Sequence, residues 1–296
     1  MQDALTQPPF KIGNIEVQQV VEMQLPLFDA ETFLPTSSAS ELAAIAPDFT
    51  PWALCGDTGK LILALQTYVL RTRHHTILVD TCVGCDKASG IPVWHMRTDT
   101  GWLQQLAAIG VAPESVDYVF CTHLHGDHIG WNTRLVDGRF VPVFTNAKYI
   151  FAKREVEFVQ SSTLENRLLA YQQSVLPVLE ANQAQLVETD FALDDEVWLT
   201  PTPGHTPGHV AVNIKSAGVE AVMVGDAIHS PLQCVHPEWF ALPDSDPELA
   251  AQTRTSLLDD CLAENRLVLT AHFPLPSVGI VAPAARGFGF TFGHGN

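Results

Sequence analysis

Three imidazoles and one carboxylate fall within six residues of this chain, in the run Thr122-His123-Leu124-His125-Gly126-Asp127-His128. These side chains are borderline and hard ligands for divalent metal ions. A helix would repeat ligands every three or four residues, whereas this spacing wraps them around a turn, and Gly126 permits the tight backbone that the turn needs. Burying the groups without a metal would cost about 1–3 kcal/mol for each unsatisfied one. The cluster therefore predicts a metal site and not a set of packed or solvated histidines.

Polar side chains also follow four segments that are typical of buried strands. They are Asp80 after 76–79, His123 after 116–121, Asp226 after 221–224 and His272 after 267–270. Strand ends hold side chains rigidly at the edge of a sheet, where ligands commonly bind.

The remaining segments predict the fold class. Further strands are expected at 15–21, 61–70, 196–199 and 210–214, and helices at 101–109, 153–180 with a break near 161–162, and 247–264 opened by Asp246 as a cap. Strands mixed with helices in this way predict an α/β fold, or α+β in other schemes. We expect the segment 30–51, rich in Ser, Thr and Pro, to be a long loop.

Composition excludes several classes of function. The 296 residues include 16 Lys and Arg against 33 Asp and Glu, a formal charge of −17, which disfavours nucleic acid and anionic membranes. No apolar run is long enough to span a membrane, and residues 1–11 do not resemble a secretory signal. Six cysteines in such a chain predict reduced thiols and a cytoplasmic protein, with Cys82 and Cys85 as structural residues.

The run from His123 to His128 resembles the His-x-His-x-Asp-His signature of the metallo-β-lactamase-fold hydrolases. The family's other ligand motifs have counterparts in a Gly-His loop at His205, a Gly-Asp pair at Asp226 and a late histidine, His272. The resemblance spans residues 61–272. It implies a four-layer αββα sandwich, in a single domain over 1–296 with a helical insertion near 153–182.

The same resemblance implies two divalent metal ions. The first would be bound by His123, His125 and His205, and the second by Asp127, His128 and His272, with Asp226 bridging the two. Imidazole-rich sites suit zinc, and a hydroxide held by the ions is the expected nucleophile, which makes Asp127 and Asp226 catalytic residues.

Three further residues are candidates around these ligands. Asp80 resembles the family's aspartate that orients a ligand histidine. His229 either lines the substrate pocket or is an ordinary loop residue, and His209 is expected to give structural support.

The residues around His128 and the Gly-Asp-x-x-His sequence at Asp226 resemble the branch of homoserine-lactone lactonases and methyl parathion hydrolase. We expect a small-molecule substrate, a lactone or carboxylic ester, with phosphotriester hydrolysis as a side activity. Many of these lactonases bind the substrate carbonyl through a Tyr in the segment before the bridging aspartate. This chain has no Tyr between His205 and Asp226. Either another donor replaces it or the substrate is not an acyl-homoserine lactone.

Two other enzyme functions remain as alternatives. One is a thioester hydrolase of the glyoxalase II kind, although Arg286 is the only cationic side chain after His272 to receive glutathione. The other is a mononuclear iron oxidoreductase acting on persulfides, which would hold one iron per chain. A non-catalytic binding module would not need the complete ligand set. Family members are often dimers, so a homodimer is also expected.

Overall fold

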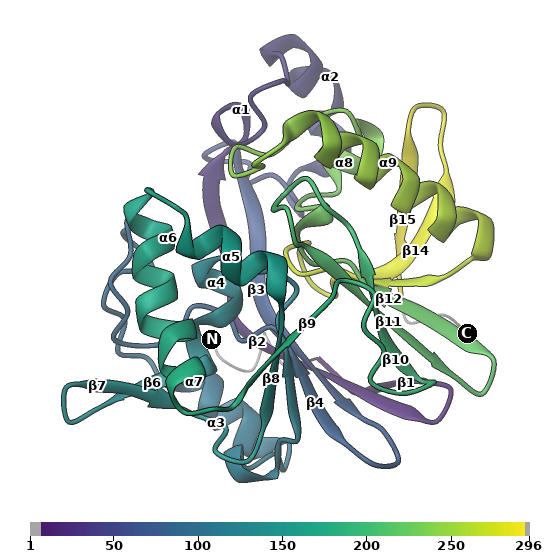
Figure 1. The fold of residues 1–296 in the computed structure, drawn as a ribbon. Coiled ribbons are helices and arrows are strands. Elements are labelled where there is room, and N and C mark those ends of the chain that lie inside the picture. The colour runs from purple at the N-terminus through teal and green to yellow at the C-terminus, as the bar shows by residue number, and fades with distance from the viewer. Residues whose placement is uncertain (1–6, 294–296) are drawn as a thin grey trace. The chain divides into compact units, whose positions relative to one another are not determined.

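The computed structural model describes residues 7–293 of the chain, which divides into two compact units. One unit holds the described residues up to Glu22 together with Leu65–Phe191. The other holds Met23–Ala64 together with the described residues from Ala192 onward. Strands β2 (Ile15–Asp29) and β3 (Lys60–Arg71) each run from one unit into the other along the chain (Figure 1).

A seven-stranded sheet has the order β1-β2-β3-β4-β5-β8-β9. Its remaining strands are β1 (Phe10–Ile12), β4 (Thr76–Val79), β5 (Tyr118–Phe120), β8 (Lys148–Ala152) and β9 (Ala184–Val187). The last four are parallel neighbours, so their carboxyl ends lie at the same edge of the sheet. A separate hairpin joins β6 (Thr133–Val136) to β7 (Arg139–Pro142).

The helices of the first unit pack around a core of apolar side chains. They are α3 (Gly101–Ala108), α4 (Gly126–Ile129), α5 (Lys153–Gln160), α6 (Glu165–Ala170) and α7 (Leu176–Glu180), with a π-helical turn at Tyr171–Val175 between the last two. The predicted break in the helical segment is confirmed, because α5 ends at Gln160. Trp102 of α3 stacks on Trp131 with ring centroids 5.5 Å apart, and both are buried.

The second unit contains a six-stranded sheet of order β10-β11-β12-β13-β14-β15. Its strands are β10 (Val197–Pro201), β11 (Val210–Ser216), β12 (Val219–Met223), β13 (Leu267–Leu269), β14 (Val278–Pro283) and β15 (Phe288–Phe292). Its helices include α8 (Leu232–Val235) and α9 (Pro247–Glu264). Helix α9 begins after Asp246, whose carboxylate accepts a hydrogen bond from the Leu249 N–H at 3.1 Å, as predicted.

The predicted loop at 30–51 is wrong, because this segment forms helices α1 (Ala30–Phe33) and α2 (Ala39–Phe49). The Ser38 side chain accepts from the Glu41 N–H, while the Glu41 carboxylate accepts from the Ser38 N–H, which makes a capping box. Leu42 and Phe49 are buried on one face of α2. The Ser- and Pro-rich composition predicted a loop, although the segment contains a capped helix with an apolar face.

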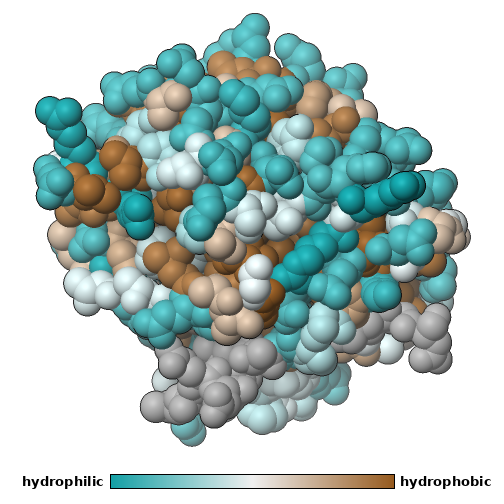
Figure 2. Space-filling view, turned by 90° about the horizontal axis from the view of Figure 1, so that it is seen from below, coloured by the Kyte–Doolittle hydropathy of each residue, from teal (hydrophilic) through white to brown (hydrophobic). Residues whose placement is uncertain are grey.

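The α/β class is confirmed. On the face drawn in Figure 2, hydrophilic residues predominate and hydrophobic ones lie between them. Within residues 7–293, no helix combines the length and the apolar character that crossing a membrane requires.

Candidate metal centre

The histidine-rich turn follows β5, and Asp80 anchors it from the end of the neighbouring strand β4. The parallel register pairs Val79 with Phe120, so the residues just beyond the two strands meet. The Asp80 carboxylate accepts hydrogen bonds from the Thr122 N–H at 2.8 Å and the Thr122 hydroxyl at 2.9 Å. Adjacent parallel strands therefore bring together two polar segments that lie 42 residues apart.

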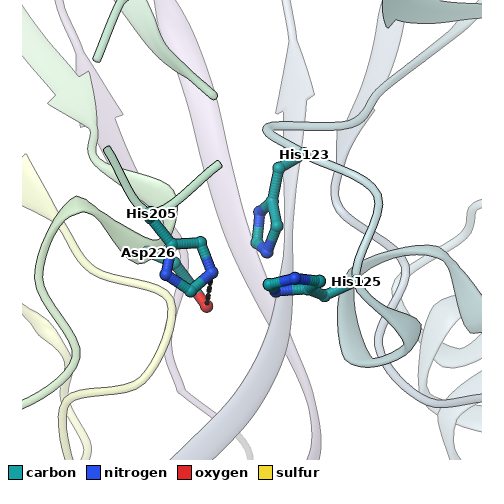
Figure 3. Close-up of side chains that lie close together, drawn as sticks. All are labelled: His123, His125, His205 and Asp226. Carbon is teal, nitrogen blue, oxygen red and sulfur yellow. Dashed lines mark ion pairs between the residues drawn. The ribbon is translucent and has the colours of Figure 1, made fainter. Parts of the chain in front are cut away.

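The four predicted ligands of this turn lie close to one another. The His123 ring centroid is 4.2 Å from that of His128. It is 4.6 Å from that of His125, whose ring meets it edge-on (Figure 3). Asp127 Oδ2 lies 3.8 Å from His128 Nε2. His123 and His128 are buried, whereas His125 and Asp127 are partly exposed, so the turn has an inner and an outer edge.

The loop that follows Asp80 is hydrogen-bonded to the histidine-rich turn. The Thr81 N–H donates to the His128 carbonyl at 2.6 Å, and the Gly130 N–H donates to the Cys82 carbonyl at 2.7 Å. Burial raises the pKa of the Cys82 thiol far above its usual value, so Cys82 is a neutral side chain and not a thiolate ligand. Its structural role is consistent with the sequence-based expectation.

The Glu22 carboxylate accepts hydrogen bonds from the Val83 N–H at 2.8 Å and from the Trp131 indole N–H at 2.9 Å. It thereby joins the supporting loop to the segment that follows the ligands. Nothing in the sequence marked Glu22 as part of this region.

In the second unit, His205 lies in the predicted Gly-His loop. Its Nδ1 is 2.8 Å from Asp244 Oδ1, and its Nε2 is 3.3 Å from Asp226 Oδ2 (Figure 3). Gly204 takes a positive φ of 129°, and a side chain there would overlap the backbone of Ala250 in α9. The glycine before the ligand therefore allows the loop to approach this helix closely.

Asp226 follows β12 and His272 follows β13, and because the two strands are parallel neighbours, both residues lie beyond the same end of the sheet. Oδ1 of Asp226 lies 3.0 Å from His272 Nε2, whereas Oδ2 lies 3.3 Å from His205 Nε2 and 3.1 Å from His229 Nε2. The two carboxylate oxygens thus face different histidines, which is the arrangement that a bridging carboxylate requires.

His229 and His209 differ in their surroundings. His229 is buried, its ring stacks on His272 with centroids 5.8 Å apart, and Phe33 meets it edge-on at 5.3 Å. His209 Nδ1 lies 2.7 Å from the Thr202 hydroxyl, and its Nε2 accepts a hydrogen bond from the Asp226 N–H at 2.9 Å. One nitrogen of His209 therefore contacts the Thr202 side chain and the other holds the Asp226 backbone, consistent with structural support.

Asp244 and Arg254 also belong to this region, and sequence analysis missed both. They form an ion pair at 3.4 Å with both side chains completely buried. Burial raises the pKa of Asp244 and outweighs the opposing effects of His229 and Arg254. Asp244 follows no strand and belongs to no ligand motif, so no local signal could have identified it.

The histidines share a feature that determines which nitrogen can bind a metal. Nδ1 faces the Thr122 hydroxyl in His123, Asp80 Oδ2 in His128, Asp244 Oδ1 in His205 and the Ala64 carbonyl in His272. The carboxylates and the carbonyl can only accept, so Nδ1 carries the proton in the last three and Nε2 carries the lone pair. With the carboxylates of Asp127 and Asp226, these donors fit divalent transition-metal ions.

The model of the metallo-beta-lactamase superfamily matches residues 65–272. The chain belongs to this superfamily. The predicted resemblance is thereby confirmed over residues 65–272, and so is the predicted fold.

Sequence relatives of this superfamily member include hydrolases. An N-acyl homoserine lactonase from a Bacillus species is 28% identical over 227 residues, covering 72% of this chain and 83% of the relative. The probable metallo-hydrolase YflN of Bacillus subtilis (strain 168) is 26% identical over 218 residues, covering 67% and 75%. The predicted enzyme class, a metal-dependent hydrolase of the lactonase-like kind, is confirmed.

Two solved structures show the same metallo-β-lactamase fold over 98% of both chains. The hydrolase AbOPH of the beta lactamase superfamily matches with a TM-score of 0.83 at 20% identity. AidC, a dizinc quorum-quenching lactonase in complex with a product, matches with a TM-score of 0.79 at 22% identity.

Proposed function

We propose that this superfamily member hydrolyses a lactone or carboxylic ester with the help of two divalent metal ions, which are zinc. The proposed ligands are His123, His125 and His205 for one ion, Asp127, His128 and His272 for the other, and Asp226 for both. The observation that carries the proposal is the engagement of Nδ1 in His128, His205 and His272, which leaves the Nε2 lone pair for a metal.

The surroundings of Asp226 support its bridging role. Its oxygens face His205 and His272 separately, at 3.3 Å and 3.0 Å, and these two histidines are assigned to different ions. A carboxylate in this position would offset the charge of both ions. When bound, the ions would supply Lewis acidity and a more acidic water molecule.

The chain's own residues would then orient the substrate. His229 lies buried between Asp226, His272 and Phe33, so a polar ring nitrogen is held next to an apolar wall. We assign His229 to the substrate pocket, where an imidazole N–H can donate to an ester oxygen. This donor would replace the Tyr that the sequence lacks before Asp226.

The relatives support a lactone more than the other substrates, because those named N-acyl homoserine lactonase match most of this chain. Hydrolysis of a thioester or phosphotriester would need the same two ions, so metal content cannot distinguish these substrates. Only a comparison of their hydrolysis rates can. A persulfide oxidoreductase differs in its metal, since it would contain one iron per chain.

The test combines metal analysis with a substrate screen on one preparation. We expect about two zinc ions per chain, turnover of lactones or aryl esters above thioesters and phosphotriesters, and loss of turnover on chelation. Asp226→Asn should lower turnover by at least about 100-fold while circular dichroism stays unchanged, because one oxygen of the bridge is lost. Full activity in the metal-free protein, or one iron per chain, would contradict the proposal.

A further inference from the structure

Asp244 and Arg254 form a buried ion pair next to His205. Asp244 Oδ1 faces His205 Nδ1 at 2.8 Å. Asp244 Oδ2 accepts from the Ala241 N–H at 2.9 Å and from the Arg254 guanidinium at 3.4 Å. Each oxygen of the carboxylate therefore has its own partners.

Arg254 is held in place by groups other than Asp244. Its Nε donates to the Ala227 carbonyl at 2.9 Å, and its Nη1 donates to the carbonyls of Pro237 and Trp239 at 2.8 Å each. A guanidinium has only donors and stays charged, so the atom of residue 244 that faces it must be an acceptor. Since Ala227 follows the proposed bridging ligand Asp226, the same arginine also fixes the backbone next to that ligand.

We propose that Asp244 and Arg254 are positioning residues that hold His205 in the tautomer with the proton on Nδ1, so that Nε2 is the metal-binding nitrogen. As an ionised carboxylate paired with the charged Arg254, Asp244 has no hydrogen to donate, so Oδ1 accepts from Nδ1. At the other ring nitrogen, Asp226 Oδ2 lies 3.3 Å from Nε2, farther than the 2.8 Å between Nδ1 and Asp244 Oδ1, so Asp244 is the acceptor that holds the proton. The metal-binding part of this inference rests on the proposed function, whereas the tautomer itself is a property of the protein without metal.

The arrangement makes Asp244→Asn a sharp test. The oxygen of the new amide must face Arg254 and the Ala241 N–H, because both are donors. Its NH2 group then faces His205 Nδ1, which must accept and lose its proton to Nε2. A protonated Nε2 cannot bind a metal, so a near-isosteric change should remove one ligand while the fold remains.

The first experiment needs no variant. Nitrogen-15 NMR of metal-free wild-type protein, at a pH where the imidazole is neutral, should show His205 protonated on Nδ1 and unprotonated on Nε2. Protonation on Nε2 would overturn the inference, whatever the protein binds.

The second experiment compares zinc binding to wild type, Asp244→Asn and the control Asp246→Asn by competition with a chelator. The Asp246 side chain caps α9 by accepting from the Leu249 N–H, and Asn is an equally good cap, so this control should bind zinc like wild type. In Asp244→Asn one of two zinc ions should bind about 10- to 100-fold more weakly, and the melting temperature of its metal-free form should stay close to wild type.

Equal affinity for both zinc ions in Asp244→Asn and wild type would overturn the inference. If wild type binds no zinc, the proposed function fails, and the NMR result alone decides the tautomer. If Asp244→Asn does not fold, the wild-type NMR measurement still confirms or overturns the assignment.

Discussion

Glu22 is a partly buried carboxyl group that three N–H donors and Arg97 do not fully compensate. Burial is the largest effect and raises its pKa from 4.5 to about 7, against the hydrogen bonds from Val83, Gly84 and Trp131. The folded protein therefore binds more protons at Glu22 than the unfolded chain does between pH 4.5 and 7. By linkage, this residue makes the free energy of unfolding fall as the pH rises through that window.

Glu22→Gln should remove this pH dependence, because glutamine resembles the protonated acid. At pH 5 the variant and wild type should have similar stabilities. At pH 8 the variant should be the more stable by up to about 3 kcal/mol. Solvent near the exposed part of the side chain screens the effect and makes this difference smaller. Urea unfolding of the metal-free proteins at both pH values measures the difference.

The control for this comparison is Glu157→Gln on α5, where the glutamate side chain is 62% exposed. Its stability relative to wild type should change little between the two pH values. If the stability of Glu22→Gln relative to wild type is also the same at both pH values, ionisation of Glu22 does not destabilise the folded protein, and the prediction is wrong.

At the scale of elements, the short helix α4 and the turn after it depend on a close approach of two backbones. A Cβ at Gly130 would overlap the carbonyl group of Val83, and both segments are tied to each other by hydrogen bonds from Thr81 and Gly130. Neither segment can move away without breaking the bonds that support His128.

Gly130→Ala should therefore lower the free energy of unfolding by about 3 kcal/mol or more, or prevent folding. The matched control is Gly289→Ala in β15, where the added Cβ would lie 3.5 Å from the Ala282 carbonyl oxygen, an ordinary contact. Denaturant unfolding of both variants tests the prediction. If Gly130→Ala and Gly289→Ala have equal free energies of unfolding, the loop at Val83 moves to accept the added Cβ, and the prediction is wrong.

At the scale of the whole molecule, the acidic composition favours cation binding. The formal charge is −17, and the carboxylates of Asp80, Asp127, Asp226 and Asp244 all lie beside the proposed ligands or among them. Without the proposed cations, the carboxylates of Asp127 and Asp226 would lose the positive charges that offset them. Metal binding should therefore stabilise the folded chain as well as activate it.

Adding zinc to the metal-free protein should raise its melting temperature, and chelation should reverse the change. A ligand at about 1,000 times its dissociation constant stabilises the state that binds it by about 4 kcal/mol. Thermal unfolding at several zinc concentrations measures this effect, and Asp226→Asn should show a smaller rise. A melting temperature that does not respond to zinc would count against a metal bound to the folded chain.

The sequence alone determined the parts of the site that are local. The residues His123, His125, Asp127 and His128 lie within six positions of one another. Asp80 and Asp226 are each a polar residue that follows an apolar strand, which the sequence also shows. Side-chain type, strand periodicity and the residue that ends a strand are all properties of short stretches, so a linear pattern can carry them. The capped helix α2 shows the limit of composition, since a segment whose Thr, Ser and Pro content predicts a loop contains a capping box at Ser38 and Glu41.

Only the tertiary structure decided which groups orient the ligands. His205 pairs with Asp244 from 39 residues away, and His272 pairs with the Ala64 carbonyl from 208 residues away. A hydrogen bond between such distant residues leaves no periodic trace in the chain, because any loop that returns to the right place can supply the acceptor. Short segments of the sequence therefore identify the ligand residues, whereas the tautomers and orientation of these residues depend on contacts that form only in the folded chain.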